Sequence, residues 1–384
     1  MGFSFSTDVL IVGGGVIGLS IARELRRKGV NKITILERGA VGREASYAAA
    51  GMLAPNAEND THDDFYDFCS LSCSMYPGFA AELLAETDVD IELERSGTLY
   101  LSFGEEDSKV LNKRYLWQRK AGVAVEKLSA EETLNFEAFI SPRVRKSLFY
   151  PGDWQVDNRK LLKALRRYAE LNGIEILEQT GVMSLITEKE MVVGARTDSG
   201  TFFTGVTVLA TGAWTSLIKI DGAPLPVEVK PIRGQMISFH PARQMFSKVV
   251  FSRRGYIVPR MDGRVLSGAT VEDAGFDQST TSDGAEQLVK TAVEIAPSLS
   301  GFDIVDHWAG LRPFAADGLP VLGEVPGIGN LLVATAHFRN GILLGPMTAK
   351  VICQQIMDGT SSKYLDIFGV NRLKTLDANG LFRG

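Results

Sequence analysis

A glycine-rich turn between an apolar run and an apolar-striped stretch constrains this chain more than any other feature. Val9 to Val12 are all apolar, which is typical of a strand buried on both faces. Gly13, Gly15 and Gly18 follow in the G-x-G-x-x-G spacing. The first glycine permits a tight turn, the second lets the backbone approach a pyrophosphate, and the third lets the helix lie close to the strand. The spacing therefore predicts a strand–turn–helix unit that holds phosphates at the helix N-terminus.

The next run along the chain favours a nucleotide ligand. Residues 32–37 form a second β-rich stretch that ends in Glu37, about 20 residues on, where ribose hydroxyls need an acceptor. Glycine-rich turns are common, so a strand–turn–helix without a ligand is the alternative. The acid at this position favours a dinucleotide. Because Glu37 suits NAD and FAD alike, the turn alone does not choose between them.

The order of the elements predicts an α/β protein with two domains. A chain of 384 residues can bury more than one core. Nucleotide-type elements recur at both ends and in the middle, and β-rich insertions separate them. We expect a discontinuous Rossmann-like cofactor domain (1–91, 151–224 and 315–384) and a second α+β domain with a large antiparallel sheet (92–150 and 225–314). The ligand site should lie at the interface between the two domains.

Local patterns place some of the elements more closely. Residues 226–239, 249–259 and 265–269 each read as one long antiparallel strand of the second domain. Asp157 is a plausible cap for a helix that Gly173 ends.

Composition excludes several classes of partner. The net charge is −5 and no run is dense in Lys or Arg, so we expect no nucleic acid. The uncharged stretch Val9–Ala22 is too short to cross a bilayer and is broken by glycines, so neither a membrane partner nor a targeting segment is expected, which favours the cytoplasm. The three cysteines are an odd number, which argues against a disulfide framework, and the four histidines lack metal-ligand spacing, so no metal is predicted.

A stretch of small residues follows the second strand. Residues 45–51 are rich in alanine and could lie against a large flat ligand without side chains in the way. An alanine-rich helix packed on the sheet explains the same composition, and composition alone leaves both readings open.

Together, several motifs resemble the FAD-dependent D-amino-acid oxidase family, and within it the glycine oxidases of thiazole (thiamine) biosynthesis. The likeness runs from about Asp8 to about Met357, and its most specific pieces are Ala48–Leu53 and His337–Leu344. It implies a two-domain protein with noncovalent FAD, because no cysteine lies between Cys73 and Cys353, where some relatives attach the cofactor. The positions expected to bind FAD are Gly13, Gly15, Val16, Ile17, Gly18, Glu37, Arg38, Ala45, Ser46, Ala50, Gly51, Met52, Val182, Thr211, Gly212, Trp214, His337, Phe338, Arg339, Asn340, Gly341, Ile342 and Leu343.

The same resemblance implies a site for a small amino-acid or amine substrate. Arg312 would clamp the substrate carboxylate, for which the guanidinium fork offers two donors. Tyr256 would donate a hydrogen bond to the substrate, Arg339 would lie beside flavin and substrate, and Met52 would line the pocket. Each has a simpler explanation: Arg312 as a surface-strand arginine, Tyr256 as a core residue, and Arg339 as a solvent-facing residue at a helix start.

The chemistry implied is oxidative deamination of glycine or a similar small amino acid (sarcosine, D-alanine, D-proline). A hydride passes from the substrate Cα to flavin N5, the imine hydrolyses to a 2-oxo acid such as glyoxylate and ammonia, and molecular oxygen yields hydrogen peroxide. A dehydrogenase that passes electrons to a quinone or carrier protein, an NAD(P)H-dependent monooxygenase and a non-enzymatic FAD protein are the alternatives. The oligomeric state is open, with a homo-oligomer among the options.

Three departures from the family pattern concern the pocket. Ala336 stands where a glycine is more usual, Val271 where some glycine oxidases have methionine, and Arg254 where some relatives have histidine. They put pocket size and substrate preference in doubt and leave FAD binding intact.

Overall fold

The glycine turn joins strand β1 (Phe3–Val12) to helix α1 (Val16–Arg27) in the computed structural model, which describes residues 3–241, 243–360 and 362–375. Gly13 has a φ of +109°, and a Cβ there would lie 2.4 Å from the carbonyl oxygen of Ala210. A Cβ at Gly18 would lie 2.0 Å from the carbonyl oxygen of Gly13. Only glycine fits these two positions, as the spacing predicts.

Parallel pairing builds the sheet that carries this turn. β1 pairs in parallel with β2 (Ile33–Leu36) and β11 (Gly200–Leu209), and β11 pairs in parallel with β20 (Leu331–Thr335). The rest of this ten-stranded sheet is formed by β8 (Glu175–Leu177), β9 (Val182–Glu188), β10 (Met191–Thr197), β12 (Lys219–Ile220), β13 (Ala223–Pro224) and β19 (Val321–Glu324). The carboxyl ends of β1, β2 and β11 therefore meet at one edge, where an α/β sheet binds its ligand.

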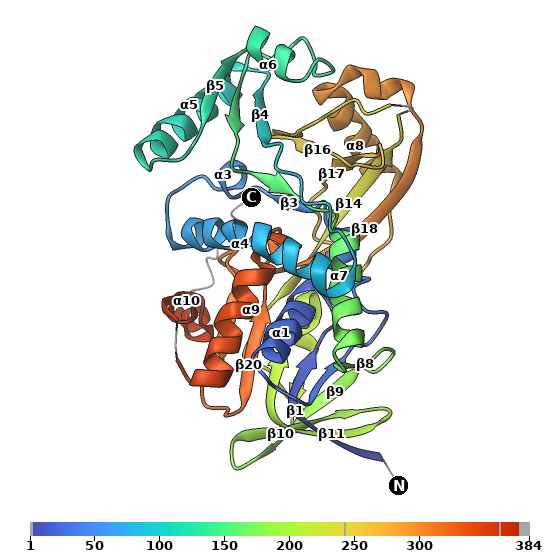
Figure 1. Cartoon of the computed structure of the whole chain (residues 1–384), viewed down its shortest axis with the longest axis vertical. Helices are drawn as coiled ribbons and strands as arrows, with labels where there is room; N and C mark the ends of the chain where they lie inside the picture. The colour runs from blue at the N-terminus through green and yellow to red at the C-terminus, as the bar shows by residue number, and fades with distance from the viewer. Residues whose placement is uncertain (1–2, 242, 361, 376–384) are drawn as a thin grey trace.

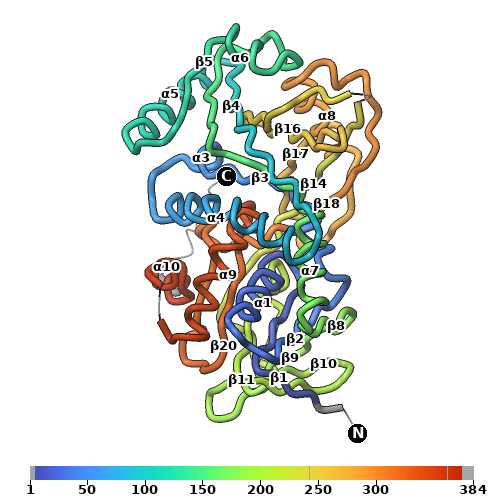
Figure 2. Tube along the Cα trace, viewed as in Figure 1, coloured from blue at the N-terminus to red at the C-terminus, as the bar shows by residue number. Residues whose placement is uncertain are grey.

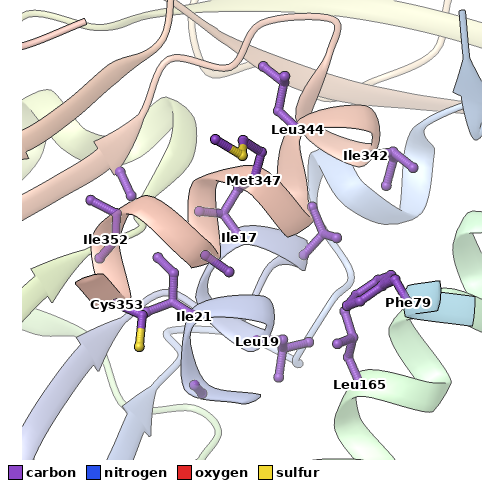
Figure 3. Close-up of a cluster of buried hydrophobic side chains, with 14 of the residues drawn as sticks. Ile17, Leu19, Ile21, Phe79, Leu165, Ile342, Leu344, Met347, Ile352 and Cys353 are labelled. Carbon is purple, nitrogen blue, oxygen red and sulfur yellow. The ribbon is translucent and has the colours of Figure 1, made fainter. Parts of the chain in front are cut away.

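Four helices pack together beside this sheet: α1, α4 (Asp64–Thr87), α7 (Asn158–Leu171) and α9 (Gly341–Asp358). Figure 3 shows their apolar contact, in which Ile17 and Ile21 of α1 lie beside Met347 and Ile352 of α9. Asp157 caps α7 as predicted, since its carboxylate accepts hydrogen bonds from the backbone of the first turn. Helix α10 (Lys363–Ile367) follows α9.

A proline inside α9 creates a need for a side-chain donor. Pro346 has no N–H, so the carbonyl of Ile342, four residues earlier, has no helical partner. The hydroxyl of Tyr76 in α4 donates to that carbonyl instead. Ser72 on the same helix donates to the carbonyl of Leu343 at 2.6 Å. Helix α4 thus completes the hydrogen bonding of the first turns of α9.

Replacing Tyr76 by phenylalanine is expected to lower the free energy of unfolding by about 1–3 kcal/mol. The ring would still fit, but a buried carbonyl would lose its donor. Denaturant unfolding of the two proteins measures the difference. Tyr115→Phe is the control, because no hydrogen bond of the Tyr115 hydroxyl is present in the described chain. Equal losses for both variants would contradict this account of Pro346.

The second large sheet lies at the other end of the molecule (Figures 1 and 2). Its order is β18 (Ile304–Phe314), β14 (Lys230–Phe239), β17 (Val265–Gly268), β16 (Gly255–Pro259), β15 (Val249–Ser252), β4 (Thr98–Ser102), β6 (Lys146–Tyr150) and β5 (Glu126–Ser129). Helices α5 (Glu105–Lys120), α6 (Ala130–Phe136) and α8 (Ser282–Ile295) pack on it. The α/β class is confirmed.

Two details of this sheet differ from the prediction. The stretch 249–259, expected as one strand, is a hairpin of β15 and β16, because the chain turns at Arg253 and Arg254 between the paired residues Ser252 and Gly255. The sheet is also not wholly antiparallel, since β4 and β15 come from different inserted segments and pair in parallel. All strands of this sheet fall within 92–150 and 225–314. The domain boundaries themselves stay a prediction, and residues 1–2 and 376–384 of the predicted cofactor segments lie outside the described residues.

The segment of small residues lies between the two sheets. Helix α2 (Ala45–Ala48), β3 (Met52–Leu53, paired with β7, Trp154–Gln155) and α3 (Pro55–Glu58) follow one another there. The indole of Trp308 donates to the carbonyl of Ala48 at 3.0 Å, and a Cβ at Gly310 would lie 2.5 Å from the Ala48 side chain. Strand β18 therefore packs directly against α2.

A buried arginine fastens the same segment. The guanidinium of Arg260, which follows β16, donates to the carbonyls of Ala50 at 2.8 Å and Val156 at 2.7 Å and to the Asn158 side chain at 3.0 Å. The Arg260 side chain, at the end of a strand of the eight-stranded sheet, thus joins the segment around Ala50 to the segment that contains Val156 and Asn158. Within the described residues, no helix is both long and apolar enough to cross a membrane.

Candidate active site

A cavity of about 300 Å³ opens at the carboxyl ends of β1, β2 and β11. The glycine turn forms one wall, and the turn after β11 and the start of α9 form others. Pockets at this edge of a parallel sheet are where dinucleotides bind.

The glycine turn leaves room for a pyrophosphate. Among the described residues, the Ser46 hydroxyl oxygen is the near neighbour of a Cβ added at Gly15, at 3.2 Å, so little else stands in front of this residue. Gly15 is also the N-cap of α1 and offers no side-chain cap, so the helix start faces the cavity. Ser46 reaches the same helix end, accepting from the backbone N–H of Val16 at 3.1 Å.

Glu37 and Arg38 shape the wall next to the turn. The Glu37 carboxylate accepts from the backbone N–H of Gly14 and of Gly39, both at 2.8 Å, so it braces the turn as well as facing the cavity. The guanidinium of Arg38 stacks over the Trp214 ring with its carbon 3.8 Å from the ring centre. Val182 lies beside this pair, giving a flat, apolar end that suits an adenine ring.

The other end of the cavity is closed by the turn before α9. His337 is buried, and its Nε2 lies 3.0 Å from the Thr348 hydroxyl. Burial lowers the pKa of His337 to about 3, so the ring is neutral at physiological pH. Phe338 packs edge-on against Phe314, with the two ring centres 5.0 Å apart. Ala336 has a φ of +56°, which explains why a glycine is the more usual residue at that position.

A second cavity, of about 660 Å³, lies against the eight-stranded sheet and adjoins the first. The two share Ala45, Ala49, Phe338, Arg339 and Ile342 as lining residues. A flat group that extends from the first cavity would therefore form part of the wall of the second.

Arg312 lies on β18 at the base of the second cavity. Its guanidinium is half-buried, and among the described residues it donates to two backbone carbonyls: Thr270 at 3.0 Å and Arg233 at 3.4 Å. Burial lowers its pKa, and the nearby Tyr256 opposes this shift. A guanidinium stays charged even so. Among the described residues it has no ion-pair partner, so a buried positive charge faces the cavity unneutralised.

Gly234 makes room for that guanidinium. An added Cβ would lie 2.1–2.3 Å from the Arg312 nitrogens and carbon. Gly234→Ala is expected to displace Arg312 at a cost of about 1–3 kcal/mol, which corresponds to a KM for the amino acid raised about 5- to 150-fold. Steady-state kinetics measure the KM, and the visible spectrum measures the bound cofactor, which should be retained. An unchanged KM would show that Arg312 is not constrained from this side.

Tyr256 lies beside Arg312 on β16. Its ring is buried and stacks on Phe251 at 5.8 Å, and its hydroxyl lies 3.9 Å from the sulfur of Met236, a weak acceptor. Burial raises the pKa of Tyr256, and Arg312 opposes this shift. The phenol therefore keeps its proton and has a strong hydrogen bond left to give.

Arg339 and Met52 complete the predicted set. Arg339 is exposed and lines both cavities, and within the described part of the chain it makes no hydrogen bond or ion pair. Met52 lines the second cavity on the side of the small-residue segment. The structure thus brings Tyr256, Arg312, Arg339 and Met52 to one cavity.

Most positions predicted to bind the cofactor line the first cavity. Three line the second cavity instead: Ala50, Gly51 and Met52. Three line neither: Gly18, which lets α1 approach β1; Asn340, the N-cap of α9; and Leu343, which packs in the core.

The sequence reasoning missed two residues of the second cavity. Gly234 had a signal, because a glycine inside a strand often marks a close approach. Glu58 had none, since no motif or spacing in the sequence marks it. Arg254 and Val271, two of the departures from the family pattern, also line this cavity.

Comparisons with known proteins agree with this geometry. The family model DAO, described as FAD dependent oxidoreductase, matches residues 8–355. A glycine oxidase of Pseudomonas aeruginosa is 33% identical over 356 residues, covering 92% of this chain and 95% of that protein. The crystal structure of glycine oxidase from Geobacillus kaustophilus superposes with a TM-score of 0.91 at 32% identity, covering 96% of this chain and 99% of the other. An L-proline dehydrogenase from P. horikoshii, with a TM-score of 0.86 at 20% identity over 97% of this chain and 99% of the other, shows the fold alone.

Proposed function

The chain belongs to the DAO family of FAD-dependent oxidoreductases, and from this we propose that it deaminates glycine or a similar small amino acid oxidatively. Sarcosine, D-alanine and D-proline are the other substrates of this size. The products are the imine and then the 2-oxo acid (glyoxylate from glycine), ammonia and, with oxygen as the acceptor, hydrogen peroxide. The enzyme class and the FAD cofactor follow from the family.

The observation that carries the proposal is the unneutralised Arg312 guanidinium beside the Tyr256 phenol. A buried arginine without an acidic partner is costly unless a ligand supplies the anion. The carboxylate of an amino acid matches the guanidinium fork and can accept from the phenol as well. Both groups lie in the cavity that adjoins the dinucleotide cavity.

The protein's own contribution is to bind and orient. Arg312 and Tyr256 would fix the carboxylate, so that the substrate Cα points towards the shared wall of the two cavities. FAD, when bound, supplies the two-electron acceptor for the Cα hydride. No protein base is needed at Cα, because the hydrogen leaves with its electron pair. We also infer that FAD is held noncovalently, since none of Cys69, Cys73 and Cys353 lines either cavity.

A panel of amines with peroxide detection tests the proposal on the purified yellow protein. Flavin bleaching by glycine or its small relatives under anaerobic conditions, followed by peroxide formation in air, is the expected result. Bleaching without rapid reoxidation in air would point instead to a dehydrogenase that uses a quinone or carrier protein. No bleaching by any amine would overturn the proposed function.

A further inference from the structure

A short helix with both ends held by buried polar groups projects an acidic side chain into the substrate cavity. Helix α3 ends at Glu58, which lines the second cavity. The Asp153 carboxylate, fully buried, accepts from the backbone N–H groups of Asn56 at 3.0 Å and Ala57 at 2.8 Å. Its position at the helix start fixes where the last residue of α3 points.

The far end of α3 is held from helix α5. Arg114 donates to the carbonyls of Ala57 and Asn59, both at 2.9 Å, and Gln118 donates to the carbonyl of Asn56 at 2.8 Å. The Glu58 side chain takes no part in these hydrogen bonds. Within the described residues the Glu58 carboxylate has no hydrogen bond and no ion pair, although several arginines line the cavity that it faces.

The charges around Glu58 come from every element that packs near it. The positive groups are Arg114 of α5, Arg312 of β18 and Arg339 of the turn before α9. The other titratable groups near it are Asp153, Cys69 and Tyr256, and the same cavity is lined by Asp60, which pairs with Arg114, and by Tyr100, Arg253 and Arg254. Burial raises the pKa of Glu58, and the three arginines oppose this shift. A carboxylate whose pKa is raised takes up a proton more readily than an exposed glutamate.

The proposed reaction requires an acceptor for a proton of the substrate ammonium group, and none of the residues assigned to substrate binding can serve as one. At neutral pH a free amino acid carries an ammonium group, because its amine pKa lies above 7. The Cα hydride can leave only when the nitrogen lone pair is free to form the imine. An amino acid that binds with its ammonium group must therefore lose a proton before the hydride leaves, and Arg312, Arg339 and Tyr256 are all donors that cannot take it.

We propose that Glu58 accepts the ammonium proton of the bound amino acid. The N–H bond breaks, its electron pair stays on nitrogen, and an O–H bond forms on the Glu58 carboxylate; no electron is transferred to or from the protein. Before this step the carboxylate attracts the ammonium while Arg312 holds the other end of the zwitterion. This proposal rests on the proposed function, and it makes Glu58 a catalytic residue because it touches the reacting nitrogen.

The pH dependence of flavin reduction in Glu58→Gln tests the proposal, with glycine, sarcosine, D-alanine and D-proline mixed anaerobically with the holoprotein. At neutral pH the variant should reduce flavin about 10²-fold more slowly than the wild type with the substrate preferred by the wild type. The deficit should shrink as the pH approaches the pKa of the free amine, because substrate then arrives deprotonated. An unchanged rate, or an equal loss at every pH, would overturn the proton-acceptor role.

Controls separate the possible failures. Glycolate has the carboxylate of glycine without the amine, so Glu58→Gln should bind it at least as tightly as the wild type, as read from the flavin spectrum. Glu94→Gln, another partly buried acid outside both cavities, should keep the wild-type pH profile. If Glu58→Gln loses FAD, Glu58→Asp is measured in its place. Because this variant keeps a carboxylate, its rate of flavin reduction should rise with pH over the same range as in the wild type. A rate that rises only near the pKa of the free amine would contradict the proposal. A wild type that no amine reduces would refute the proposed function itself.

Discussion

Gly15→Val is expected to give a folded protein that is colourless. A Cβ added at this position makes one tight contact, with the Ser46 hydroxyl oxygen at 3.2 Å, and no contact with the backbone, so we expect the apoprotein to fold. It would stand where the pyrophosphate must lie. Loss of two charge-assisted hydrogen bonds to phosphate costs about 3–6 kcal/mol, which weakens FAD binding by about 10²- to 10⁴-fold. The visible spectrum of the purified protein and titration of the apoprotein with FAD measure this loss.

Gly78→Val is the matched control. Gly78 also has open space around it and no positive φ, but it lies on α4, away from both cavities. This variant should stay yellow. Substitution of Gly13 or Gly18 is a poor substitute for the test, because a side chain there would strike backbone and unfold the turn. A yellow Gly15→Val protein would refute the assignment of the phosphate site.

Arg312→Ala is expected to retain FAD and to lose most of its activity on amino acids. The substitution removes the donor of two hydrogen bonds from a buried carboxylate, at a cost of about 2–5 kcal/mol. This corresponds to a fall in kcat/KM of about 30- to 4000-fold, with the larger part in KM. Removing a buried, unpaired charge should also raise the stability of the substrate-free protein. Steady-state kinetics and thermal unfolding measure the two effects.

The contrast between activity and stability distinguishes a binding arginine from a structural one. Arg145→Ala, at an exposed site, is the control and should change neither. A structural arginine would lose stability and FAD together on truncation. An unchanged KM for glycine in Arg312→Ala would remove this residue from the site.

The sequence predicts the dinucleotide half of the site better than the substrate half. Gly18 acts through a contact within one strand–turn–helix unit, and Gly13 has the positive φ of the turn itself, so their spacing carries the information, although the close neighbour of Gly13 is Ala210 of another strand. Arg312 and Tyr256 lie on different strands, and nothing local shows that β18 and β16 bring them to one cavity; the family resemblance supplied them. Glu58 depends on Asp153 and Arg114, each more than 50 residues away, so no local pattern could mark it.

The errors in the fold have similar causes. Residues 249–251 and 256–258 are apolar or aromatic on both sides of the turn at Arg253 and Arg254, so the pattern does not show that the chain reverses there. The parallel pairing of β4 with β15 joins segments about 150 residues apart and has no sequence signature. The two readings of residues 45–51 also needed the structure, which has a one-turn helix that contacts β18 and faces both cavities.

The position of Arg260 bears on how molecules enter and leave. Its donors tie the end of β16 to residues 50, 156 and 158, so swinging the two halves apart would expose a charged group and leave three acceptors bare. We therefore expect an enzyme without a hinge, in which a small amino acid diffuses past the rim formed by the β15–β16 turn while the halves stay fixed. Release of the coenzyme should then be as slow as partial unfolding, and the rate of turnover should be insensitive to solvent viscosity unless diffusion through that rim limits it.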